Sequence, residues 1–497
     1  MGNGFISTVI KKCKAFECRT TFIILFLLSL FLRFPFFFRD YIDRDESTFI
    51  LVAQSWVEGN LPFTELWDVK PPLTFFFFAS IIYTFGKSIF TIRLFGVLLV
   101  AVSSFFTYKI GSHLSTKKIG FWCAMGSVVL QSLFGSLQGV MSEHITMAFF
   151  MPAMYILLTN RNFFMVLLTG VLMGIVVMVK LNMAYAILFV GLYLMFSYIK
   201  KKEYTLGFWN TVAYGAGILL VIGLTILPYI LENQLQLWYN SVVKAPLTYS
   251  ASRRYSILKL MPIIIILSTF FLVVWKKRYI DFKKPAVQIL FIAIIGVVLS
   301  FMKGGRVNGH YLIQLHPLLI IFVGIAASKI SWPRTVRFKK LILVVLVLIP
   351  AETYLEYANI IKNKISKGTF YNGEGISVPA YITENKLDKK NILFLEYQIG
   401  YWFLNVSPPT KIATHPSNLC KDELFKFFDN PRKTSVAELQ YIMEVLRPKT
   451  IVIRGDRPIF NKREVEQNAY LNAYLAKYYK IHAKVESAKI LQRLEGF

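Results

Sequence analysis

Cysteines and glycine-rich binding motifs are scarce in this sequence of 497 residues. The four cysteines (Cys13, Cys18, Cys123 and Cys420) lack metal-ligand spacing and suggest no disulfide framework. There is no dinucleotide-binding fingerprint. Gly86-Lys87-Ser88 is not a phosphate-binding loop, because Ile81 stands where that motif requires a glycine. The chain therefore offers no sign of a zinc site, a disulfide scaffold or a nucleotide-binding fold.

Acidic residues are also few, with 28 Asp and Glu against 56 Lys and Arg, and the net charge is +28. In a soluble chain this balance would suggest nucleic acid. Here the basic residues stand between apolar runs, so they are interpreted as topology signals that face anionic lipid, and no nucleic-acid partner is expected. The composition is 55% hydrophobic and the mean hydropathy is +0.51. Apolar runs of about 17 to 25 residues recur over the first two thirds, which predicts a polytopic α-helical membrane protein.

The positions of the basic loops predict the topology, since cytoplasmic loops carry an excess of Lys and Arg. The first span, 21–38, is expected to be a retained signal anchor because no small-residue cleavage site follows it. The apolar stretch 73–85 is expected to lie flat in the interface, which leaves every later basic loop inside. The predicted result is about eleven spans with a cytoplasmic N-terminus. The ten later spans fall at about 91–110, 120–138, 145–159, 163–180, 183–198, 208–230, 258–275, 286–302, 311–328 and 340–356.

The composition changes after about residue 357. Short apolar strands are expected at 392–395 and 450–453, with helices at about 436–446 and 464–478. The sequence therefore predicts two domains. Residues 1–356 form a transmembrane domain whose outer loop is 39–90, and residues 357–497 form a soluble α/β domain outside the cytoplasm.

Chemistry-bearing residues gather in the predicted outer loops. The first loop holds Asp45, Glu46 and Lys70, and the next begins at Glu143. A carboxylate can take the proton of an attacking hydroxyl, and cations can stabilise a departing phosphate. This suits transfer of a group from a phosphate to a hydroxyl. Cations lie in the later loops and at the outer ends of spans, at Arg93, Lys180, Arg253, Arg254, Arg306 and His310.

Several of these residues also have a structural alternative. Asp45 precedes an expected amphipathic helix, 47–58, and would serve equally well as its N-cap. Glu143 could extend into the lipid headgroups, and Arg253-Arg254 could contact lipid phosphate. Lys180 lies in an apolar run, where a charge is costly, which favours a function. The histidines His144, His310 and His316 make no metal constellation, so structural roles are favoured for them and no metal is expected.

Several segments together resemble a known family. Asp45-Glu46, Gly59-Asn60-Leu61-Pro62-Phe63, Lys70-Pro71-Pro72-Leu73 and Gly86…Arg93-Leu94 resemble the first outer loop of GT-C fold membrane glycosyltransferases. The relevant branch includes protein O-mannosyltransferases and lipid A aminoarabinose transferases. Later patterns are also similar, namely Ser142-Glu143-His144, Gly174…Lys180 and Gly309-His310-Tyr311-Leu312…Pro317. The resemblance covers most of residues 20–330.

The resemblance implies roles for particular residues. Asp45 of the Asp45-Glu46 pair would be the general base, Lys70 would bind the donor phosphate, and Glu143 would be a second acidic residue. It also implies a polyprenyl-phosphate-linked sugar as donor, a hexosyl or pentosyl transfer, inversion at the anomeric carbon, and no metal or other cofactor. His310 and Tyr311 match a later pattern of the family and are expected to bind substrate.

The expected function is therefore a mannosyltransferase-like glycosyltransferase in a bacterial plasma (inner) membrane. Its acceptor would be a lipid, a glycan or a protein. A transporter or flippase of lipid-linked sugars is the alternative, because such proteins also combine many spans with charged residues. Transporters tend to keep ligand groups near the membrane midplane, whereas the charges here gather at span ends on one side, which favours the enzyme.

Overall fold

The computed structural model describes residues 2–40, 43–133, 135–251, 258, 260–305, 308–330, 340, 344–345 and 347–494. The chain divides into two compact units. The first contains residues 1–36, 93–222 and 254–357. The second contains residues 37–92, 223–253 and 358–497. Each unit is thus assembled from three separate stretches of the chain.

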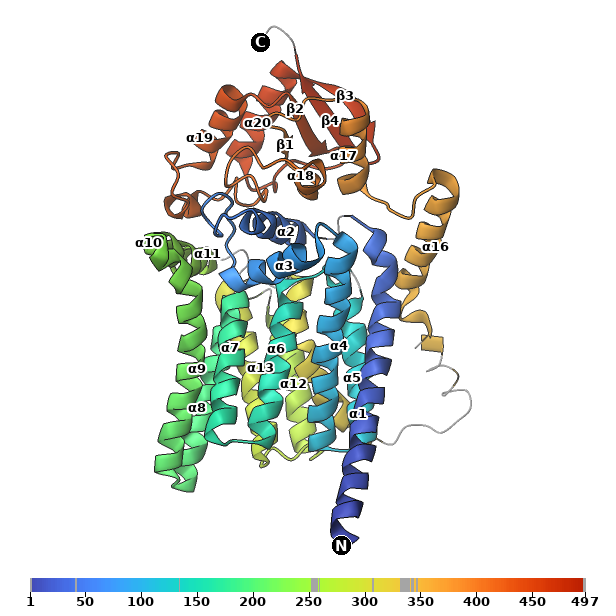
Figure 1. The fold of residues 1–497 in the computed structure, drawn as a ribbon, viewed down its shortest axis with the longest axis vertical. Coiled ribbons are helices and arrows are strands. Elements are labelled where there is room, and N and C mark those ends of the chain that lie inside the picture. The colour runs from blue at the N-terminus through green and yellow to red at the C-terminus, as the bar shows by residue number, and fades with distance from the viewer. Residues whose placement is uncertain are drawn as a thin grey trace. The chain divides into compact units, whose positions relative to one another are not determined.

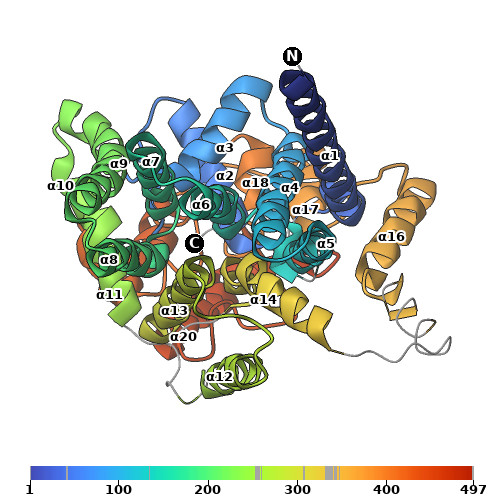
Figure 2. The same ribbon diagram turned by 90° about the horizontal axis from the view of Figure 1, so that it is seen from below.

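The first unit is a bundle of helices that run side by side (Figures 1 and 2). Close approach of two pairs depends on glycine. A Cβ on Gly170 of α7 would lie 2.3 Å from the Tyr214 carbonyl oxygen of α9, and one on Gly296 of α13 would lie 2.5 Å from the Cα of Ala186 in α8. The helices that belong wholly or partly to this unit are α1 (Gly2–Arg33), α4 (Ile89–Leu114), α5 (Lys117–Ser132), α6 (Ser142–Thr159), α7 (Phe163–Val179), α8 (Ala184–Lys201), α9 (Tyr204–Leu231), α12 (Met261–Lys276), α13 (Pro285–Gly304), α14 (His316–Lys329) and α16 (Ala351–Lys367).

Apolar helices make this chain an integral membrane protein. Among the described residues, five helical segments are long and apolar enough to cross a membrane: Glu17–Phe38, Ile89–Leu114, Leu181–Lys201, Tyr204–Leu231 and Pro285–Gly304. Four further apolar helices are shorter: Pro72–Phe85, Phe163–Val179, Met261–Lys276 and His316–Lys329. Helical segments coincide with most of the predicted spans, but the number of eleven stays a prediction.

The second unit combines helices with one small sheet. The sheet has the order β1-β2-β4-β3, in which β1 is parallel to β2 and the other neighbours are antiparallel. Its strands are β1 (Leu393–Phe394), β2 (Thr450–Arg454), β3 (Tyr479–Val485) and β4 (Ala488–Arg493). Its helices include α2 (Arg44–Val57), α3 (Pro72–Phe85), α10 (Leu235–Tyr239), α11 (Ala245–Ala251), α17 (Glu374–Glu384), α18 (Ile399–Leu404), α19 (Ser435–Gln440), the π-helical turn η8 (Tyr441–Leu446) and α20 (Val465–Tyr478).

The C-terminal elements agree with the sequence except at one hairpin. The strands β1 and β2 and the helices α19–η8 and α20 lie where they are predicted, which confirms the mixture of helix and strand. The hairpin β3–β4 was not predicted from the sequence. Its connection, Glu486-Ser487, lacks the Asn-Gly or Asp-Gly pair that marks a two-residue turn, although Glu486 adopts the positive φ of +54° that such turns require.

The helices α2 and α3 pack against each other and position the candidate site. Helix α2 begins at Arg44, three residues before the predicted start, and Gly59 with φ of +103° follows its end. Helix α3 starts at Pro72, where proline suits a first helical position, and has 14 residues. Its length is therefore about 21 Å, less than the roughly 30 Å of a bilayer core. Its placement flat in the interface stays a prediction.

Candidate functional site

Asp45 lies in the first turn of α2, between a lysine and a histidine. Lys70 donates from Nζ to Asp45 Oδ2 at 2.9 Å, and Nε2 of His415 lies 3.5 Å from Asp45 Oδ1. The Lys70 ammonium also stands over the Phe49 ring, 5.2 Å from its centre. The Asp45 side chain keeps 26% of its surface exposed, so a ligand can reach this carboxylate.

The N-cap of α2 is Asp43 and not Asp45. Asp43 has extended backbone and is the N-cap residue of α2, where its Oδ1 accepts from the Asp45 backbone N–H at 2.9 Å. The side chain of Asp45 is thus available for other partners. A negative charge in the first turn of a helix is also favoured by the helix dipole.

Glu46, the second member of the acidic pair, occupies a different environment. It is 2% exposed and buried within the unit. Successive residues on a helix point about 100° apart, because 3.6 residues make one turn. Of the two adjacent carboxylates, Asp45 is the one that a substrate can approach.

Asp68 is a third carboxylate near Asp45 and Lys70. It is buried, and Asn418 Nδ2 lies 3.5 Å from its Oδ1. The pKa of Asp68 lies above its ordinary value, and burial is the largest cause. Lys70 and His415 oppose this shift, whereas Asp45 adds to it. We refer to Asp45, Asp68, Lys70, His415 and Asn418 as the Asp45 cluster.

A segment near residue 414 holds the loop before α3 in place. The Trp67 backbone N–H donates to the Lys411 carbonyl at 2.9 Å, and the Thr414 hydroxyl donates to the Trp67 carbonyl at 2.7 Å. The Trp67 indole N–H donates to the Ser241 hydroxyl at 2.9 Å, and Phe428 packs on the ring with a centroid distance of 4.4 Å. These bonds position Lys70 and bring His415 to Asp45. His415 and Asn418 were not predicted as site residues, because no local pattern in the sequence marks them.

The first unit contains a second charged cluster, which we call the Glu143 cluster. It consists of Ser142, Glu143, Lys180, His310 and Tyr311. Lys180 forms a salt bridge with Glu143 and lies 3.4 Å from the Ser142 hydroxyl, and its ammonium stands 4.5 Å from the centre of the Tyr311 ring. His310 Nε2 lies 3.8 Å from Glu143 Oε1.

Burial distinguishes the Glu143 cluster from a set of headgroup contacts. The Glu143 side chain is 0% exposed, so it does not extend into the lipid headgroups. Among the described residues, His310 Nε2 has no hydrogen-bond partner. His144 differs, since its two ring nitrogens contact the Met141 backbone N–H and the Gln131 carbonyl oxygen, a structural role.

Arg93, another of the predicted substrate-binding residues, belongs to neither cluster. Arg93 is fully buried in α4 and donates to the Phe36 carbonyl oxygen, so it contacts backbone in its own unit. Arg253, Arg254 and Arg306 lie outside the described residues. Within the described part of the chain, no group of three His, Cys, Asp or Glu residues is arranged to hold a metal ion.

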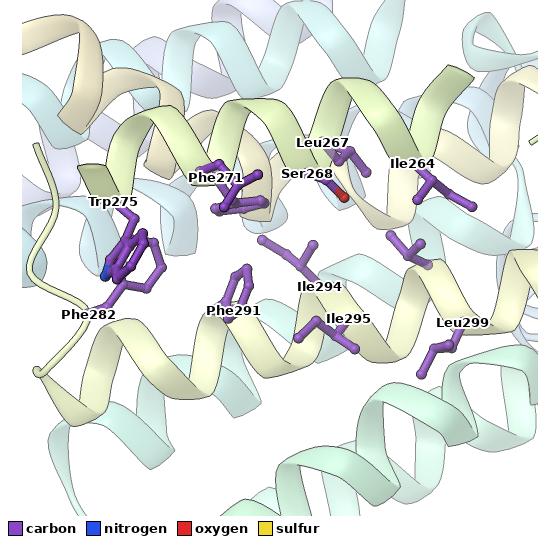
Figure 3. Close-up of a pocket in the computed structure, with 12 residues that line it drawn as sticks. Ile264, Leu267, Ser268, Phe271, Trp275, Phe282, Phe291, Ile294, Ile295 and Leu299 are labelled. Carbon is purple, nitrogen blue, oxygen red and sulfur yellow. The ribbon is translucent and has the colours of Figure 1, made fainter. Parts of the chain in front are cut away.

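An apolar cavity of about 560 Å³ lies between α12 and α13. Figure 3 shows Phe271, Phe291 and Ile294 around it, with Trp275 at one end and Leu299 at the other. Ser268 contributes the only hydroxyl among its described lining residues. Such a lining suits a hydrocarbon chain and offers little to a polar ligand.

Comparisons with known proteins give the fold a precedent. No family model matches the sequence, and no curated protein matches it. The crystal structure of ArnT from Cupriavidus metallidurans bound to undecaprenyl phosphate is similar, with a TM-score of 0.61 and 12% identity. The match covers 100% of this chain and 99% of that chain. The Archaeoglobus fulgidus oligosaccharyltransferase tethered with an acceptor peptide is similar with a TM-score of 0.50 and 10% identity. That match covers 94% of this chain and 72% of that one.

Both of these proteins are GT-C fold membrane glycosyltransferases. At this level of identity the likeness concerns the fold. The chain has the GT-C fold, which confirms the fold that the sequence resemblance implied.

Proposed function

We propose that this protein is an integral-membrane glycosyltransferase. It moves a sugar from a polyprenyl-phosphate donor to an acceptor hydroxyl at the outer face of a bacterial plasma membrane, with inversion at the anomeric carbon. The observation that carries the proposal is the Asp45 cluster, in which a reachable carboxylate is held by Lys70 and His415 in a chain with the fold of ArnT. The undecaprenyl phosphate in the ArnT crystal supports a lipid-linked donor.

In the proposed reaction, the acceptor oxygen attacks the anomeric carbon while the bond from that carbon to the phosphate oxygen breaks. Asp45 takes the proton of the hydroxyl as general base. The polyprenyl phosphate leaves with the bonding electrons, and Lys70 stabilises the charge that develops on it. Attack opposite to the leaving phosphate inverts the configuration.

The salt bridge between Lys70 and Asp45 gives this reaction an order. Before the donor binds, Lys70 neutralises Asp45 at 2.9 Å. The donor phosphate competes for the same ammonium and draws it away from the carboxylate. Asp45 then keeps His415 as its neighbour and can accept a proton. Donor binding therefore precedes activation of the acceptor in our proposal.

The other predicted residues have supporting roles in the proposal. Glu143 is the second acidic residue, held by Lys180, and His310 and Tyr311 bind substrate beside it. Arg253, Arg254 and Arg306 are proposed as further cations for the donor phosphate, whereas Glu46 and Arg93, both buried, are proposed to support the site without contacting substrate. The cavity between α12 and α13 would accept part of a polyprenyl chain. Residues 1–356 form the proposed membrane domain and residues 357–497 the proposed outer domain.

The test is transfer by the purified protein in detergent micelles. Polyprenyl-phosphate sugars extracted from the source membrane are incubated with the protein and cell-surface glycans, and released polyprenyl phosphate is measured by mass spectrometry. A transferase releases it, whereas a flippase has no compartments to connect in micelles and releases none. Sugar movement across vesicle membranes without release of polyprenyl phosphate would favour the transporter instead.

A further inference from the structure

The C-terminal part of the second unit carries a groove that the proposed reaction does not use. Its volume is about 660 Å³, which lies within the range of about 300–1,000 Å³ typical of ligand pockets. Helix α20 forms one wall, and η8 and the end of β4 contribute the rest. The lining residues are Glu444, Arg447, Tyr470, Ala473, Tyr474, Lys477, Tyr478 and Arg493.

Three tyrosines form a ladder along α20. Tyr470, Tyr474 and Tyr478 are spaced four residues apart, so they share one face of the helix. Their ring centres are 5.8 Å apart in the first pair and 4.5 Å apart in the second. All three side chains are only half-buried. The ladder therefore packs the helix and still presents ring surface to the groove.

Two of the three tyrosine rings are held by hydrogen bonds from their hydroxyls. The Tyr470 hydroxyl donates to Glu444 Oε1 at 2.8 Å, and the Tyr474 hydroxyl donates to the Met443 carbonyl at 2.9 Å. A ligand would meet a platform that loses little conformational freedom on binding.

Positive charge surrounds this platform. Arg447, Lys477 and Arg493 face a single acidic residue, Glu444, in the lining. Lys477 Nζ stands 5.0 Å from the centre of the Tyr478 ring, and the Arg493 guanidinium stands 5.7 Å from it. Lys477 is exposed and forms no salt bridge within the described part of the chain. The lining thus carries three positive charges against one negative charge.

We propose that this groove binds an anionic saccharide. Aromatic rings offer flat apolar surface to the C–H faces of sugar rings, and the polar groups at the edges bond to hydroxyls. The excess of positive charge selects a sugar that bears a carboxylate or a phosphate, and arginine suits both groups. The proposal assigns a binding role to the C-terminal region and does not depend on sugar transfer.

Binding can be measured with the full-length protein in detergent. The probe is tetragalacturonate, an oligosaccharide with one carboxylate on each ring, and the neutral comparison is maltotetraose. Isothermal titration calorimetry should give saturable binding of tetragalacturonate that weakens as salt is raised, because the attraction between exposed charges is screened. Maltotetraose should bind more weakly.

Two variants distinguish the contribution of the Lys477 charge to binding from that of the Tyr478 ring. Lys477→Gln should weaken tetragalacturonate binding about threefold to fivefold, as expected for one exposed charge pair. Tyr478→Ala should weaken it about tenfold, since aromatic side chains that a ligand covers on binding contribute much of the binding energy. The matched control is Lys462→Gln, which removes an exposed lysine outside the groove lining and should bind as the unchanged protein does.

Three results would overturn the proposal. One is the absence of saturable tetragalacturonate binding. Another is an affinity that Lys477→Gln and Lys462→Gln lower equally, which would indicate a non-specific effect of net charge. The third is Lys477-dependent binding to phosphatidylglycerol vesicles without binding of tetragalacturonate, which would make the groove a lipid-surface contact. None of these measurements uses donor or turnover, so they are independent of the proposed glycosyltransferase activity.

Discussion

Lys70 Nζ lies 2.9 Å from Asp45 Oδ2, which joins the loop before α3 to the first turn of α2. In our proposal this salt bridge holds the general base until the donor phosphate takes over the lysine. The bond is partly exposed, so its energy is modest, and the singly charged phosphodiester of the donor can compete for Lys70.

Asp45→Asn should lower sugar transfer by about 10²–10⁴-fold, because the amide cannot take the acceptor proton. Donor binding should persist. The melting temperature should change little, since Asp43 rather than Asp45 caps α2. Transfer from a synthetic polyprenyl-phosphate sugar in detergent measures this. The matched control, Asp43→Asn, removes a neighbouring charge and retains a good N-cap, so it should transfer normally. Near-normal turnover by Asp45→Asn would remove Asp45 from the catalytic role.

Lys70→Ala should weaken donor binding and turnover together, because the phosphate loses its positive partner. Lys70→Arg should recover little, since the guanidinium is bulkier and the ammonium is already packed over Phe49. Equilibrium binding of the labelled donor measures the effect. Lys87→Ala serves as control, because it removes a lysine of the same unit that bonds to Asn405 instead of Asp45. Unchanged donor affinity in Lys70→Ala would contradict the role.

Asp68→Asn should alter how stability depends on pH. Burial raises the pKa of Asp68, so the folded protein binds this proton more tightly than the unfolded chain. The contribution of Asp68 to stability is thus fully present below the ordinary pKa of 3.8 and is lost as pH rises through the raised value. The Asp68→Asn variant does not undergo this loss. In detergent, its melting temperature should therefore increase relative to that of the unchanged protein as pH rises from about 4 to about 8.

The control for the pH experiment is Asp429→Asn, which changes an exposed aspartate of the same unit. Its melting temperature should follow that of the unchanged protein at every pH. A constant difference between Asp68→Asn and the unchanged protein over the whole range would mean that Asp68 does not titrate in this window.

Lys180→Met should destabilise the first unit by about 3–5 kcal/mol, because it leaves the fully buried Glu143 without its salt-bridge partner. The double variant Glu143→Gln with Lys180→Met should cost less than Lys180→Met alone, since both charges are then removed. Unfolding in detergent, followed for both single variants and the double variant, gives the coupling. If the free energy of unfolding lost in the double variant equals the sum of the losses in the two single variants, the two side chains are not coupled.

Accessibility in intact cells should test the topology. In a cysteine-free background, Asn60→Cys should react with a membrane-impermeant maleimide added from outside, and Lys201→Cys should not. This follows from the basic residues that mark the predicted cytoplasmic loops. Both positions are at least partly exposed, so a failure to react reflects location. Labelling of Lys201→Cys alone would reverse the predicted orientation.

The sequence by itself determined the properties that depend on local composition. Apolar runs identify membrane helices because hydropathy sums over neighbouring residues and needs no tertiary partner. Asp45 and Lys70 were predicted from one short loop, Glu143 from its place at the start of the next outer loop, and Lys180 from the cost of placing a charge in an apolar run. The short hairpin β3–β4 was missed because its turn lacks a characteristic residue pair.

Only the tertiary structure decided which charges meet. It assigned the cap of α2 to Asp43, paired Glu143 with Lys180 and brought His415 to Asp45. Asn418 bonds to the carbonyl of Trp67, 351 residues earlier in the chain. Contacts over such separations arise from the packing of the whole unit, and no local pattern records them. A salt bridge requires two side chains within a few ångströms, and distance in space is set by the fold.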